Sequence, residues 1–122
     1  MTFALEPHTL QEMGFSIIKQ NEDIIKIVKG RCEIYITDCG TYTRLELPVI
    51  NLWGKRKSSS SLMEYLLDRN GELNGPGFFG IKDRRIYYIS IIQNNGRIEE
   101  TALEMQRIIE KLGPKIMNIA KQ

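Results

Sequence analysis

The stretch SLMEYLLDRNGELNGPGFFGIKDRRIYYISI, residues 61–91, decides the fold because a helical pattern gives way to a strand pattern within it. Residues 61–64 have the Ser-x-x-Glu spacing of a capping box, which marks the start of a helix. Asn70-Gly71 is a typical helix end. Between these signals, apolar residues repeat four apart, as one helix face requires: Leu62 and Leu66, Met63 and Leu67.

The second half of the stretch predicts a β-hairpin, with strands over residues 78–82 and 85–93 and a tight turn near Asp83-Arg84. The longer strand is apolar on both faces. One face carries Tyr87, Ile89 and Ile91, and the other carries Ile86, Tyr88 and Ile92. One layer of helices covers only one face of a sheet, so the other face should meet water or a partner.

Upstream, residues 15–20, 24–29, 31–37 and 42–50 are rich in β-formers, and Lys29-Gly30-Arg31 forms either a turn or a bulge. In residues 31–37, one face holds Cys32, Ile34 and Ile36, and the other holds Glu33, Tyr35 and Thr37. Since these runs are close in sequence, an antiparallel meander is the simplest topology. A short helix precedes them, with Thr9 as its cap and Gly14 as its end.

A last helix begins near Glu99 or Thr101, and its apolar stripe lies on the sheet. Gly113-Pro114 interrupts the pattern, so we expect a kink or a break there. The stripe consists of Ile98, Ala102, Met105, Ile109, Leu112, Ile116 and Ile119. Residues 1–122 therefore form a single α+β domain in the order α-βββ-α-ββ-α. Its antiparallel sheet has about five strands, with helices packed on one face.

The composition is that of an ordinary folded domain: 122 residues, 42% hydrophobic and 26% charged. A net charge of +2 is too balanced to indicate binding to nucleic acid or membrane by itself. The sequence begins without the pattern of a signal peptide and holds no apolar run of membrane-spanning length. We therefore expect a cytoplasmic protein whose Cys32 and Cys39 are free thiols.

Residues 75–80, GPGFFG, match the nucleotide-binding pattern G-x-G-x-x-G. Here, however, the glycines follow a helix and precede a strand, the reverse of a dinucleotide site, and Pro76 removes one N–H from any phosphate cradle. The glycines are better explained by chain reversal, which predicts positive φ at Gly71, Gly75 and Gly77. We expect no nucleotide site.

No pattern indicates catalysis, a metal or a cofactor. His8 is the one histidine of the sequence. It is therefore the only residue that could act as the base of a Ser-His or Cys-His catalytic pair. Cationic residues form two clusters of the kind that contact a nucleic acid or another acidic partner: Lys55, Arg56 and Lys57 in a serine-rich loop, and Lys82, Arg84 and Arg85 at the hairpin tip. With tyrosines as stacking platforms, these clusters make a nucleic-acid-binding protein the alternative reading.

The order helix, Leu66-Leu67-x-x-Asn70, glycine-rich link, FFGI hairpin and final helix resembles the type III secretion chaperone-like superfamily, in particular its YbjN-type branch of sensory-transduction regulators. The resemblance implies an α+β fold, a homodimer, no enzymatic activity and a polypeptide partner. It supplies no catalytic residue. The secretion chaperones tend to be acidic, whereas this chain is slightly basic.

The sequence thus predicts a non-catalytic protein-binding module, chaperone-like or regulatory, that acts as a homodimer. An enzyme with an unrecognised site is the reading with the least support. We expect the surface for the partner or the second copy to come from the apolar strands, at Ile34, Tyr35, Tyr87, Tyr88, Ile89 and Ile91. We expect no contact with a membrane.

Overall fold

The computed structural model describes residues 5–52, 60–72, 75–93 and 96–121. Three helices and six strands follow one another along the chain. They are α1 (Pro7–Glu12), β1 (Ser16–Lys19), β2 (Ile24–Lys29), β3 (Cys32–Asp38), β4 (Tyr42–Asn51), α2 (Ser60–Glu72), β5 (Phe78–Lys82), β6 (Arg85–Gln93) and α3 (Ile98–Ala120).

All six strands form one antiparallel sheet in the order β1-β2-β3-β4-β6-β5. The expected α+β class is confirmed. Four strands, rather than three, precede α2, because Gly30-Arg31 forms a hairpin turn and not a bulge. Lys29 pairs with Cys32 across this turn, and Gly30 has a φ of +61°, which glycine adopts without strain.

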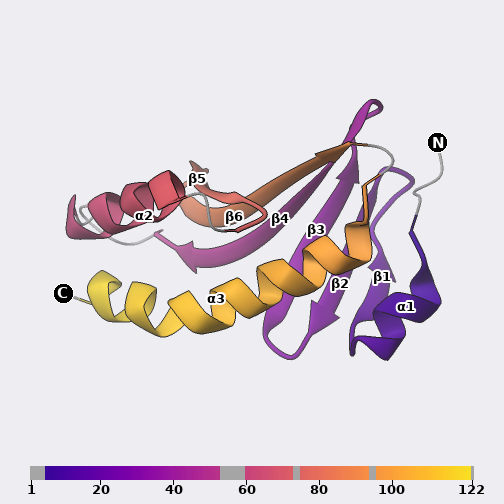
Figure 1. Ribbon diagram of the computed structural model, residues 1–122, viewed down its shortest axis with the longest axis horizontal. Helices are drawn as coiled ribbons and strands as arrows, with labels where there is room; N and C mark the ends of the chain where they lie inside the picture. The colour runs from indigo at the N-terminus through magenta and orange to yellow at the C-terminus, as the bar shows by residue number, and fades with distance from the viewer. Residues whose placement is uncertain (1–4, 53–59, 73–74, 94–95, 122) are drawn as a thin grey trace.

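The helices lie on one face of the sheet, as expected (Figure 1). α1 contacts β1 at one edge, α3 crosses the middle against β4 and β6, and α2 contacts β5 at the other edge. Alternate strand residues point into the layer between sheet and helices, where burial of apolar surface supplies the main stabilisation. Its fully buried side chains include Leu10, Ile27, Ile34, Ile36, Leu45, Ile86, Met105 and Ile116.

The helix boundaries differ from expectation at both ends of the chain. α1 begins at Pro7, whose fixed φ suits a first helical position, and not after Thr9. Gly14, with a φ of +94°, follows its end as predicted. α3 is a single helix with Pro114 inside it, so the chain does not break there. Ile116 and Ile119 are buried beyond the proline, and this packing offsets the lost backbone hydrogen bond.

α2 buries one of its two apolar pairs fully, and of the second pair only Met63 packs against the core. Leu62 and Leu66 are buried, whereas Leu67 is 68% exposed. The helix also continues past Asn70 to Glu72. Asn70 instead serves the sheet: its Oδ1 accepts from the N–H of Phe79 at 2.6 Å, and its Nδ2 donates to the carbonyl of Phe79 at 3.0 Å. Because β5 is an edge strand, this side chain satisfies backbone groups that no further strand pairs with.

The expectation of positive φ at Gly71, Gly75 and Gly77 is wrong, because none of them has it. Close packing is the reason for two of these glycines. A Cβ at Gly77 would overlap the backbone carbonyl of Ile89, and one at Gly75 would overlap the Tyr88 hydroxyl.

Candidate functional site

The face of the sheet opposite the helices, which we call the open face, carries the residues that alternate with the core. Strand pairing places one residue of each strand in a row across it. From β1 to β5 the row is Ile18, Lys26, Tyr35, Glu46, Ile89 and Phe78. The row is apolar at both ends and polar in its centre, so the open face offers two kinds of surface.

One end of the open face exposes large apolar side chains. Phe78 is 43% exposed and Ile91 is 53% exposed, and Ile89 lies between them because it pairs with Phe78 and precedes Ile91 by two residues on the same face. We call these three residues the apolar corner. Contiguous exposed apolar groups are typical of a surface that meets another protein.

The centre of the open face holds a buried carboxylate. Glu46 is only 7% exposed, and each of its oxygens accepts from a different cation. Oε1 is 3.1 Å from Nε of Arg44, and Oε2 is 3.0 Å from Nζ of Lys82. Burying a carboxylate is costly unless it is paired, and the two cations supply that pairing.

Lys82 reaches Glu46 from the far edge of the sheet. Its ammonium lies 5.2 Å from the ring centroid of Tyr87. Around these groups the open face is hollowed by about 340 Å³. We call this site the charged hollow. The lining residues that give it its chemistry are Tyr35, Arg44, Glu46, Lys82, Arg85 and Tyr87.

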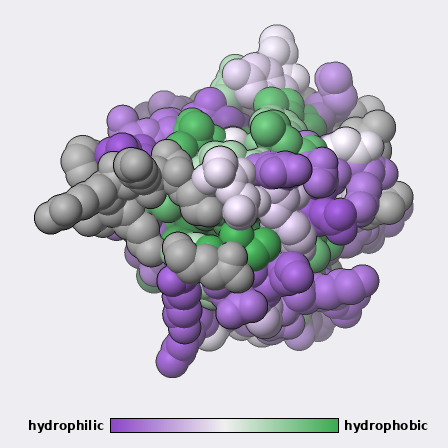
Figure 2. Space-filling view, turned by 90° about the vertical axis from the view of Figure 1, so that its left-hand side faces the viewer, coloured by the Kyte–Doolittle hydropathy of each residue, from purple (hydrophilic) through white to green (hydrophobic). Residues whose placement is uncertain are grey.

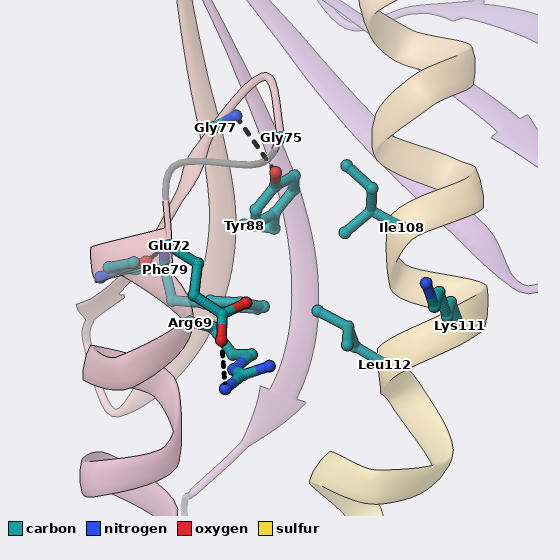
Figure 3. A pocket seen from close by; sticks show the side chains of 10 residues that line it. Arg69, Glu72, Gly75, Gly77, Phe79, Tyr88, Ile108, Lys111 and Leu112 are labelled. Atoms are coloured by element: carbon teal, nitrogen blue, oxygen red, sulfur yellow. Dashed lines mark hydrogen bonds and ion pairs between the residues drawn. The ribbon is translucent and has the colours of Figure 1, made fainter.

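A second cavity, of about 230 Å³, lies on the other side of the sheet between α2, α3 and the β5–β6 hairpin (Figure 3). Ile108 and Leu112 point into it from α3, opposite Tyr88 and Phe79, whose ring centroids are 5.0 Å apart. The Tyr88 hydroxyl accepts from the N–H of Gly77 at 3.1 Å. Burial raises the pKa of Tyr88. Because Arg69, Glu72 and Lys111 also line the cavity, its wall is partly apolar and partly charged.

The end of the molecule that holds α2 and the end of α3 also has apolar groups at its surface. Leu67 of α2 and Met117 of α3 are exposed. Figure 2 faces this end and shows hydrophobic patches among hydrophilic residues. These residues lie on the helices and so belong to a different surface from the open face.

The structure divides the residues expected to meet a partner between the two faces of the sheet. Tyr35, Tyr87, Ile89 and Ile91 lie on the open face. Ile34 and Tyr88 lie beneath the helices, with exposed fractions of 0% and 4%, so they are core residues. The candidate surface for a partner therefore consists of the other four residues.

The hairpin-tip cations also separate. Lys82 and Arg85 line the charged hollow, whereas Arg84 lies in the turn and donates from Nη2 to the carbonyl of Leu52 at 3.3 Å. Lys55, Arg56 and Lys57 lie outside the described residues. Sequence reasoning missed Arg44 and Glu46 as site residues. The available signal was two charged residues alternating with Leu45 and Leu47 in a predicted strand.

The remaining motifs form no recognisable reaction centre. His8 on α1 lies 2.9 Å from Glu12 one turn later, and both side chains are mostly exposed. Within residues 5–52, 60–72, 75–93 and 96–121, no three His, Cys, Asp or Glu residues cluster as metal ligands would. The GPGFFG stretch joins α2 to β5, as the sequence predicts, and therefore opens no helix. In the same described part of the chain, no helix has the length and apolar character needed to cross a membrane.

No family model and no curated protein matches the chain. Solved structures do. The chain is similar to one in the heterodimeric complex ExoU–SpcU from the type III secretion system of Pseudomonas aeruginosa, with a TM-score of 0.68 and 8% sequence identity. The likeness covers 95% of this chain and 98% of that one. It shows that the two chains share one α+β fold, whereas membership of the type III secretion chaperone-like superfamily stays a prediction. The YbjN-type branch stays a prediction.

Proposed function

We propose that this protein is a non-catalytic polypeptide-binding module, chaperone-like in its action, and that it works as a homodimer. The observation that carries the proposal is the open face of the sheet, where the apolar corner of Phe78, Ile89 and Ile91 adjoins the charged hollow. A surface with an apolar part and a charged part suits recognition of another chain.

Likeness of fold supports the polypeptide partner. The neighbouring structure is a heterodimeric complex of two different polypeptides from a type III secretion system. The same neighbour is described as heterodimeric, so the homodimer depends on the apolar corner alone. Burying one large apolar side chain at an interface contributes roughly 1.5–3 kcal/mol, and a symmetric contact buries each of the three twice.

Light scattering tests the homodimer. The intact protein should show about twice the chain mass of 14.1 kDa at micromolar concentration. Ile91→Asp places a charge in the apolar corner and should shift the mass to that of one chain. Leu67→Asp is the matched control, because Leu67 is equally apolar and more exposed but lies on α2. A monomeric wild-type protein, or dissociation caused by Leu67→Asp alone, would contradict this part of the proposal.

A permanently unfolded polypeptide tests the binding activity. Reduced and carbamidomethylated α-lactalbumin, followed by fluorescence anisotropy, should bind saturably, and the folded form of the same protein should not. Recovered α-lactalbumin should be unchanged in mass, because the proposal includes no turnover. Equal affinity for the folded and unfolded forms would argue against a chaperone-like role, and a chemically altered product would argue for an enzyme.

A further inference from the structure

The charged hollow on the open face combines features that select the chemistry of what binds there. Its lining holds the cations Arg44, Lys82 and Arg85 against the carboxylates Glu33 and Glu46. Glu33 is further balanced by Lys26, whose ammonium lies 4.0 Å away. Cations therefore outnumber carboxylates, and the hollow carries a local positive excess that a negatively charged group would neutralise.

The cations of the hollow are held in place before any partner arrives. Glu46 is buried and fixes Nε of Arg44 with one oxygen and Nζ of Lys82 with the other. Side chains that are already positioned lose less conformational entropy on binding, so the affinity gained per contact is larger. Arg85 is exposed, and no partner for its side chain is seen within the described ranges.

From this geometry we infer that the charged hollow binds an acidic segment of a polypeptide partner, with a Glu or Asp side chain seated among Arg44, Lys82 and Arg85. The rings of Tyr35 and Tyr87 border the same hollow and offer flat apolar area to the neighbouring residues of that segment. The inference rests on the proposed function and names the chemistry of its partner.

A nucleic acid fits the hollow less well than an acidic polypeptide. A phosphate backbone presents many closely spaced charges, and it would have to pass Glu33 and Glu46, which repel it. A polypeptide can place a single carboxylate among the three cations, where only that one group meets the repulsion of Glu46, and can keep neutral residues over the rest of the hollow. Repulsion by the two glutamates therefore contributes to the preference for an acidic polypeptide over a nucleic acid.

The test uses a labelled, unstructured peptide in which Glu alternates with Leu and Ser, and a matched peptide in which every Glu is Gln. Anisotropy with the full-length protein should show tighter binding of the Glu peptide, and added NaCl should weaken it. Arg85→Gln and Lys82→Gln should each weaken binding of the Glu peptide about two- to fivefold. Lys115→Gln removes the same charge from the exposed side of α3 and should have a smaller effect.

Three outcomes would overturn the inference. The Gln peptide could bind as tightly as the Glu peptide, Lys115→Gln could weaken binding as much as Arg85→Gln, or a single-stranded oligonucleotide could displace the Glu peptide and bind more tightly. Thermal unfolding of each variant shows whether lost binding reflects lost structure. The carbamidomethylated α-lactalbumin assay uses neither of the two peptides. If it succeeds while the two peptides bind equally, the partner chemistry is wrong and the proposed function stands.

Discussion

Gly77 shows how a residue chosen for packing can imitate a nucleotide motif. It belongs to a G-x-G-x-x-G match, yet its role in this structure is to let the chain pass against the backbone of Ile89. A Cβ there would overlap the carbonyl oxygen of Ile89, and backbone cannot move aside as the end of a side chain can. The glycine pattern is thus explained without a ligand.

The Gly77→Ala variant should lower the free energy of unfolding by about 1–3 kcal/mol, the usual cost of forced overpacking. Urea denaturation followed by circular dichroism measures it. Gly71→Ala is the control, because Gly71 lies within α2, where a Cβ meets nothing within 4 Å and no proline follows directly. That variant should raise the stability by about 0.5–1 kcal/mol. Equal effects of the two substitutions would show that close packing is not what requires Gly77.

Cys32 is the residue whose chemistry the fold changes most clearly. Burial, and next to it the charge of Glu110, raises the pKa of its thiol from 9.0 to about 11. A raised folded-state pKa favours the neutral form. The resulting stabilisation is therefore complete below pH 9 and is lost as the pH rises from about 9 to about 11.

We therefore expect slow alkylation of Cys32 by iodoacetamide at neutral pH, with a rate that keeps rising with pH until about pH 11, because the thiolate is the reactive form. Glu110→Gln should increase the rate by lowering the pKa. Glu64→Gln on the exposed side of α2 should leave it unchanged. Peptide mass spectrometry of timed samples measures the label at each cysteine. Rapid labelling of Cys32 at pH 7 in the wild-type protein would refute its burial.

At the scale of elements, α2 and β5 are joined by one side chain. Asn70 makes two hydrogen bonds to the backbone of Phe79, one as acceptor and one as donor. It thereby takes the place that a further strand would occupy at this edge of the sheet. The helix and the strand edge consequently stabilise each other.

Asn70→Ala should lower the free energy of unfolding by about 1–3 kcal/mol, because two partly buried backbone groups lose their partners. The N–H of Phe79 should also exchange faster with solvent deuterium, as NMR or mass spectrometry detects. Asn118→Ala, on an exposed position of α3, is the matched control and should change neither quantity. If Phe79 keeps its protection in Asn70→Ala, the edge is closed by something other than this side chain.

Elements were predictable from sequence wherever periodicity and burial agree. In β3 and β6, strict alternation assigned Ile34 and Ile36, and Ile86 and Tyr88, to shared faces, and the structure confirms both assignments. The alternation of side chains along a strand does not reveal which face of the sheet the helices cover. Ile34 and Tyr88 were therefore predicted to lie on the partner surface, although both are core residues. The break predicted at Pro114 does not occur. Helix propensity is a local property, whereas the buried residues that follow Pro114 keep the helix intact through their tertiary contacts.

The candidate site was less predictable than the fold because it is assembled across strands. Glu46 and Lys82 are far apart in sequence and meet only because β4 and β5 both flank β6. Nothing in a single run of residues encodes that contact. The side chain of Arg85, by contrast, lies where hairpin reasoning places a tip residue, next to the Asp83-Arg84 turn.

At the scale of the whole molecule, the sheet has one core face and one open face, and β3 presents both. Ile34→Glu buries a charge without a partner and should abolish cooperative folding. Tyr35→Glu places the same charge on the open face and should leave the fold intact while weakening capture of the unfolded polypeptide. Circular dichroism melts and the anisotropy assay measure the two effects. A folded Ile34→Glu protein would contradict the assignment of the faces.

The strand order also has a consequence for how the chain reaches this structure. β1 to β4 pair with their neighbours in sequence, but β6 joins β4 across the whole of α2 and β5. Closing that long loop costs more chain entropy than forming any of the hairpins, and it must be completed before the sheet is whole. The meander and the β5–β6 hairpin can therefore form early and separately, and their union at the β4–β6 seam sets the pace of folding.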